Sequence, residues 1–207
     1  MSFIKQLYSE KRKELEEEVN KNVGTESVEV RFVANKVIEQ YFAMANKDDL
    51  MLSIRRLNRL VQLVDIMHRK RYAGKALFNQ GYLITESGLV VVEILCGYQC
   101  LLKGEKTKEY FERSQGEYQK LAELKVGPRL NSHIDLLVSR VLKATRYVDT
   151  VDLVKMLYTD ELQALRSSFV EYDDRPLPQE IVSELYQNFD FDKLEELNQR
   201  EKERLGV

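Results

Sequence analysis

Apolar residues recur along most of the chain at spacings of three and four, which is the pattern of a helix with one face in a core. Gly24, Gly74, Gly104 and Gly127-Pro128 interrupt this pattern and mark where helices end. We therefore predict a mostly α fold, a single compact multi-helix domain of about seven helices. The predicted helices cover residues 2–22, 28–46, 50–73, 106–124, 130–145, 150–158 and 181–189, and a charged helix begins at residue 190.

Residues 82–102 fit two different structures. Residues 82–85 and 89–95 can pair as a β-hairpin across residues 86–88, because the β-branched run Val90-Val91-Val92 favours a strand. Alternatively, Thr85 caps a helix that continues to Leu102, and this length favours a helix. We favour the helix and keep a small β-hairpin near residues 82–92 as the alternative.

The predicted helix over residues 50–73 separates apolar from cationic residues when successive side chains are placed about 100° apart. The apolar side carries Leu50, Leu57, Leu60, Val61, Val64 and His68, and the opposite side carries Arg55, Arg56, Arg59, Arg69 and Lys70. From Arg55 to Lys75, a segment that we call the basic stripe, seven bases oppose one acid, for a net charge of +6. The pattern predicts one face for a core and one cationic face for water or a partner.

The rest of the composition fits a folded chain with segregated charge. Its 207 residues are 43% hydrophobic and include only 3 Pro and 9 Gly, which allows a substantial core. From residue 171 onward, five bases oppose eleven acids, for a net charge of −6. We divide the chain into an N-terminal helical extension at residues 1–24, a helical domain at residues 25–189 and a charged C-terminal helix at residues 190–207. Because we find no signal peptide and no membrane-spanning run, we expect a cytoplasmic protein without membrane contact.

The sequence offers little catalytic chemistry. It contains no phosphate-binding glycine loop, no nucleotide fingerprint and no nucleophile elbow. Cys96 and Cys100 lie four residues apart in an apolar run, and only His68 and His133 are available to complete a metal shell, so we predict reduced, buried thiols. We expect no catalytic residue, metal or cofactor, and therefore no enzyme.

The basic stripe permits several partners. Clustered Arg and Lys attract phosphates, so nucleic-acid binding is one possibility, which Arg140, Lys143 and Arg146 would extend. The stripe can instead be solvated, meet the acidic tail of the same chain, or bind an acidic protein. The predicted helix pair around Gly104 supports a further alternative, a non-enzymatic phage structural or adaptor protein that forms homo-oligomers.

Several short motifs occur in an order that is similar to one known family. They are Val33-Ala34-Asn35 with Ile38, Ser53 before Leu57-Asn58-Arg59-Leu60, Gly74-Lys75-Ala76-Leu77-Phe78, Gly88-Leu89-Val90-Val91, Thr150-Val151-Asp152-Leu153 with Glu161, and Ile181. Together they resemble the Panacea domain, the SocA-like antitoxin domain of bacterial and phage toxin–antitoxin systems, from about residue 28 to 188. The chain departs from the family at Leu89, where the family has proline, at Gln62, where it has an aromatic residue, and in containing 0 Trp.

The resemblance implies a divergent antitoxin that binds its cognate protein toxin and masks it, with delivery of the toxin to a protease as a variant. Such an interface needs a desolvated anchor and a charged rim. Phe78 and Tyr82 are the candidate anchors, and an equally good interpretation is that both fill the core beneath the turn. The predicted partner-binding residues are Arg55, Arg59, Arg69, Lys75, Phe78 and Tyr82.

Overall fold

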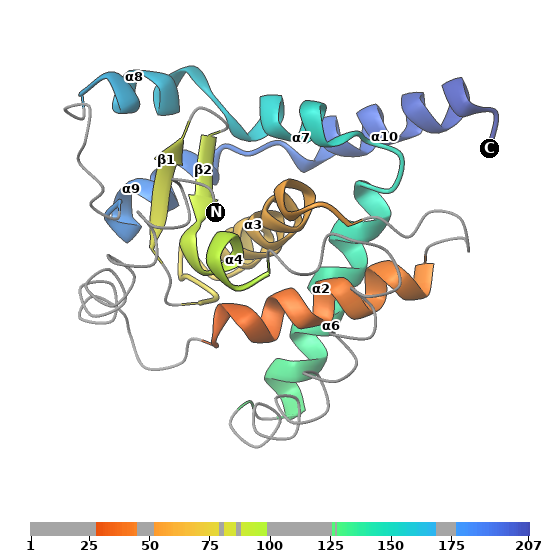
Figure 1. Ribbon diagram of the computed structural model, residues 1–207, viewed down its shortest axis with the longest axis horizontal. Coiled ribbons are helices and arrows are strands. Elements are labelled where there is room, and N and C mark those ends of the chain that lie inside the picture. Colours follow the sequence, from red (N-terminus) through yellow and green to blue (C-terminus); the bar gives the residue numbers. More distant parts are fainter. Residues whose placement is uncertain are drawn as a thin grey trace.

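The computed structural model describes residues 28–44, 52–78, 81–85, 88–98, 126, 128–168 and 177–207. Within these ranges the fold is mostly helical, with eight helices and one antiparallel hairpin of two strands (Figure 1). The predicted mostly α fold is therefore confirmed. The helices predicted over residues 2–22 and 106–124, the extension at 1–24, the turn at Gly104, Cys100 and the thiol of Cys96 lie outside what the structure describes.

One helix, α3, occupies the centre of the fold. In Figure 1 it lies in the middle of the molecule, with α7 above it and α2 below it. It packs against five other helices and the second strand. The elements are α2 (Val30–Met44), α3 (Ile54–Arg71), β1 (Tyr82–Thr85), β2 (Gly88–Val91), α4 (Val92–Gly97), α6 (Pro128–Ala144), α7 (Thr150–Leu157), α8 (Asp160–Ser168), α9 (Gln179–Gln187) and α10 (Phe191–Leu205).

Both ends of α3 are defined by local chemistry. Ser53 caps the first turn, because its hydroxyl accepts a hydrogen bond from the Arg56 N–H at 3.1 Å. After the last turn the backbone enters the left-handed region at Ala73, with φ 51°, and at Gly74, with φ 86°. The Gly74 N–H donates to the Arg69 carbonyl at 2.8 Å. The predicted helix end at Gly74 is confirmed.

Replacing Gly74 with alanine is expected to lower the free energy of unfolding by about 1–3 kcal/mol, because a side chain is strained at positive φ. The added Cβ would also lie 2.6 Å from the Ser183 hydroxyl oxygen. Gly206→Ala is the matched control, since Gly206 has φ 70° but nothing within 4 Å of the new Cβ. Urea denaturation of both variants measures the difference, and an equal loss in the two would show that the contact with Ser183 costs nothing.

The helix that we favoured over residues 85–102 is wrong for its first part, and the alternative hairpin is confirmed. β1 pairs with β2 in a register that places Tyr82 opposite Val91 and Thr85 opposite Gly88. Gly88 has φ 87°, which suits the turn and not a helix. The run that follows is buried along its whole length, so its β-branched side chains pack in the core as a strand. Helical structure begins only at Val92.

The remaining helices close the core around α3. The α2 side chain of Lys36 lies 3.2 Å from the Asp135 carboxylate of α6. The C-terminal helix α10 begins at its N-cap Asp190, buries Leu194 completely and joins the same hydrophobic cluster. Its Asn198 side chain accepts a hydrogen bond from the Tyr147 N–H at 2.8 Å. In the part of the chain that the structure describes, we find no helix long and apolar enough to cross a bilayer.

Candidate functional site

The six residues predicted to bind a partner are divided between the surface and the core. Arg55 and Lys75 are exposed. The other four are buried, with exposed fractions of 1% for Arg59, 3% for Arg69 and 0% for both Phe78 and Tyr82. The interpretation in which Phe78 and Tyr82 fill the core matches this burial, and neither presents a free surface to a partner.

The prediction that a cationic face runs along α3 is therefore wrong. Every residue from 57 to 66 is buried, because other elements pack around the whole circumference of the helix. Arg56 is half-buried and donates to the carbonyls of Val148 at 2.7 Å and Thr145 at 2.8 Å, just after α6. The members of the basic stripe that remain exposed are Arg55, Lys70, Arg71 and Lys75.

Helix α3 carries five buried polar residues that we call the polar row. Four of them recur at the spacing of a single helical face, namely Asn58, Gln62, Asp65 and Arg69. The fifth, Arg59, lies beside this face. All of them are at most 3% exposed. Because buried polar groups are costly unless they are hydrogen-bonded, their partners explain why the fold tolerates them.

The first half of the polar row binds the edge of strand β2. The Asn58 side chain donates to the Val91 carbonyl at 3.1 Å and accepts from the Val91 N–H at 3.2 Å. Arg59 and Gln62 both donate to the Leu89 carbonyl. These side chains satisfy backbone groups at the edge of β2 that a third strand would otherwise pair. Burial lowers the pKa of Arg59.

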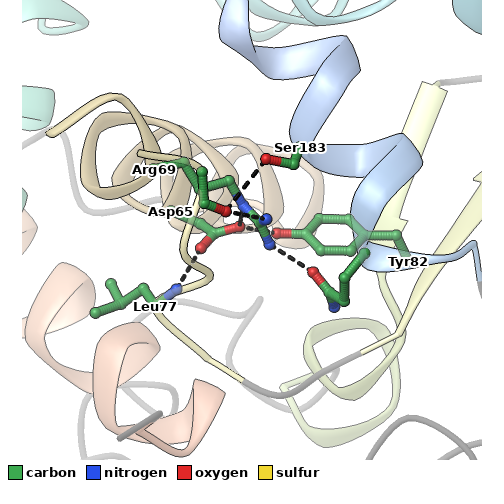
Figure 2. A network of polar contacts seen from close by, with 7 residues as sticks. Asp65, Arg69, Leu77, Tyr82 and Ser183 are labelled. Atoms are coloured by element: carbon green, nitrogen blue, oxygen red, sulfur yellow. Dashed lines mark hydrogen bonds and ion pairs between the residues drawn. The ribbon is translucent and has the colours of Figure 1, made fainter. Parts of the chain in front are cut away.

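The second half of the polar row is centred on the Asp65 carboxylate, which Figure 2 shows between α3 and β1. This group accepts hydrogen bonds from Arg69 Nε at 2.7 Å, from the Tyr82 hydroxyl at 2.5 Å and from the Leu77 N–H at 2.8 Å. Burial, followed by the charge of Asp65, raises the pKa of Tyr82 well above its ordinary value, so the phenol keeps its proton and donates it.

Arg69 extends this cluster to helix α9. Its guanidinium donates to Gln179 Oε1 at 2.5 Å and to the Gly74 carbonyl at 3.2 Å. Burial acts to lower the pKa of Arg69, but the charges and hydrogen bonds of Asp65 and Tyr82 outweigh it and raise the pKa. One buried ion pair thus joins α3, the turn after it, the hairpin and α9, so these residues act primarily in holding the fold together.

Sequence reasoning missed Asn58, Gln62 and Asp65 as members of a buried set. A usable signal was present, because residues 58, 62, 65 and 69 recur at intervals of four, three and four. When a helix carries apolar residues around its whole circumference, polar residues that recur with this period indicate a buried face whose side chains are hydrogen-bonded.

Helices α7, α8, α9 and α10 border a cavity of about 610 Å³, which we call the α7–α10 groove. Its apolar lining is buried or half-buried, whereas its charged lining is exposed, so the groove has an apolar floor and a charged rim. The floor consists of Met156, Leu157, Leu165, Ile181, Leu185, Tyr186 and Phe189, and the charged residues of the rim are Lys155, Glu161, Glu184, Asp190 and Lys193.

A second hollow, between α6 and α10, is lined mainly by charged residues of both signs. On the α6 side are Arg140 and Lys143, and on the α10 side are Glu195, Glu196, Arg200 and Glu203. Glutamates of α10 therefore lie beside basic residues of α6, which partly neutralises the cations that we had considered for nucleic acid.

Of the two hollows, the α7–α10 groove combines an apolar surface with charges, which is what a protein anchor needs. Its lining residues come from four helices, and although Glu161 and Ile181 belong to the resemblance motifs, none of them was predicted to bind a partner. The exposed cations at the end of α3 form the other candidate binding surface. Comparison of this chain with family models, with curated proteins and with solved structures found no match.

Proposed function

We propose that this protein is a non-enzymatic antitoxin, which binds a cognate protein toxin in the α7–α10 groove and masks it. The observation that supports this proposal most directly is the groove itself, with half-buried Leu185 on its floor and exposed Glu184 on its rim. Protein interfaces draw most of their binding energy from an apolar anchor that enters such a pocket, while a polar rim excludes water.

The positions of the resemblance motifs support the same proposal. Gly74 supplies the left-handed turn after α3, and Leu77 donates its N–H to Asp65. Phe78 is buried and forms a parallel β-bridge with Val28. Residues of the motifs that resemble the Panacea domain thus shape the fold. The partner surface must then be formed by other residues than Phe78 and Tyr82.

A groove variant tests the proposal. The experiment expresses the chain together with the product of an adjacent gene as the candidate toxin, and scores both growth of the host and binding of the two purified proteins. The wild-type chain is expected to restore growth. Leu185→Arg places a charge on the apolar floor and is expected to weaken binding by about 1–3 kcal/mol, or about 5–150-fold.

Leu136→Arg is the matched control, because Leu136 is 44% exposed and lies on α6, outside the groove. It is expected to bind and to rescue growth like the wild type. Unchanged affinity of Leu185→Arg would remove the groove from the proposal. A neighbouring protein that is toxic but neither bound nor neutralised would overturn the antitoxin function itself.

Nucleic-acid binding is the second candidate function, and the exposed cations Lys70, Arg71 and Lys75 favour it. Phosphate contacts release counterions, so retention on DNA or RNA is expected to fall steeply as salt increases. Charge reversal at Lys70 and Lys75 should abolish retention, whereas Lys155→Glu, on α7, should not. Retention that does not change with salt would exclude this function.

A further inference from the structure

The only two histidines of the chain meet between α3 and α6, although they are 65 residues apart in the sequence. His68 Nδ1 lies 3.3 Å from His133 Nε2, and the ring centroids are 5.5 Å apart. Both side chains are half-buried on helices that pack against each other. The ring of Tyr72 borders the pair, 4.6 Å from His68 and 5.2 Å from His133. The packing of α3 against α6 therefore holds one nitrogen of each imidazole close to a nitrogen of the other.

The separation of these nitrogens fits a shared metal ion. Zinc binds imidazole nitrogen at about 2.0–2.1 Å in a tetrahedral arrangement, which places two ligand nitrogens about 3.3–3.4 Å apart. The observed 3.3 Å matches this separation, so the two nitrogens, which form a hydrogen-bond contact in this structure, already lie at the distance of two ligands on one ion. In the part of the chain that the structure describes, no third His, Cys, Asp or Glu joins the pair to make a larger cluster.

The protonation of the pair suits a ligand role. Burial lowers the pKa of His68 to about 4 and also lowers the pKa of His133. The lowered pKa of each imidazole means that protons compete less with a metal ion for these nitrogens. One of the facing nitrogens carries a hydrogen in the metal-free pair. On binding, that imidazole moves its proton to its other nitrogen through solvent, so no net proton is released.

We propose that His68 and His133 form a two-histidine site for a divalent transition-metal ion of the zinc class, with water completing the coordination shell. Imidazole nitrogen is a preferred ligand for these ions. Two protein ligands leave positions open, so the site is weaker and more accessible than a closed structural zinc site.

Two arginines lie near this site, and they act differently. The charge of Arg69 is compensated by Asp65 at 2.7 Å. Arg71 is exposed, and its charge contributes to lowering the pKa of His133. The same positive charge repels a bound dication. Arg71→Gln is therefore expected to tighten metal binding, which a purely structural hydrogen bond between the two histidines does not predict.

The experiment measures the melting temperature of the metal-free protein as Zn²⁺ is added. Cys96 and Cys100 are replaced by serine throughout, so that thiolates do not contribute. A ligand that binds only the native state raises the melting temperature in proportion to its affinity. Loss of a residue that only orients a ligand costs about 10–100-fold in metal affinity, so His68→Ala and His133→Ala, which remove a ligand, should each lose at least about tenfold.

A zinc-dependent rise that both histidine variants lose, and that Arg71→Gln enlarges, supports the site. No rise, or a rise that His133→Ala retains, overturns it. The imidazole nitrogen NMR signals provide a second measurement on the unaltered chain, where only two histidines contribute. Zn²⁺ should shift both sets of signals together, and signals that stay in place would equally overturn the site.

Discussion

Replacement of Asp65 by alanine is expected to destabilise the fold by about 3–5 kcal/mol, because removing one member of a buried ion pair leaves the other charge uncompensated. Asp65 is 0% exposed, and its carboxylate receives donors from Arg69, Leu77 and Tyr82. All three would lose a partner in the interior. A loss of this size is a large part of the stability of a typical domain.

Urea denaturation followed by far-UV circular dichroism measures this effect. Asp152→Ala is the matched control, because its ion pair with Lys155 spans 2.8 Å between side chains that are 31% and 70% exposed. Exposed pairs of this kind contribute about 0–1 kcal/mol. If Asp65→Ala costs no more than Asp152→Ala, the Asp65 cluster does not hold the hairpin and α9 against α3.

Phe78→Ala is expected to cost about 3–5 kcal/mol of stability, the usual range for deleting a buried aromatic ring. The ring is 0% exposed and stacks with Tyr82 at a centroid separation of 6.3 Å. Its backbone also pairs with Val28 ahead of α2. The truncation would leave a cavity where these segments meet, so the protein should unfold at a lower urea concentration.

This result decides between the two interpretations of Phe78 that the sequence left open. A partner anchor would leave the free energy of unfolding unchanged and weaken only toxin binding. Leu136→Ala provides the reference for an exposed apolar side chain, with 44% exposure and an expected effect within about 0.5 kcal/mol. Equal stability of the Phe78 and Leu136 variants would contradict the core assignment.

The hairpin is the element whose secondary structure we could not predict correctly from the sequence. Long periodic segments such as α3 and α6 were predicted closely, because a helix of 17 or 18 residues repeats its apolar spacing several times. The run from Leu89 to Val92 is too short to show a period. The backbone at Gly88 and the pairing with β1 determine that it is a strand.

The candidate site was harder to predict than the fold. Arg59 and Arg69 look like surface cations in the sequence, because arginine is seldom fully buried. Their burial depends on acceptors supplied by distant segments, namely the Leu89 carbonyl and the Gln179 side chain. The α7–α10 groove likewise joins residues from four helices. Spacing along α3 can indicate a buried polar face, but it does not show which distant segments supply the acceptors or line the groove.

The sequence by itself determined the helical class and the end of α3 at Gly74, because these depend on residues within one or two turns of each other. The helix that we predicted from residue 50 begins instead after its N-cap Ser53. Only the tertiary structure decided that residues 57–66 of α3 are buried on every side, where Phe78 and Tyr82 lie, and that the two histidines meet. These outcomes depend on packing around the whole circumference of one central helix, and burial is a property of that packing and not of any local pattern.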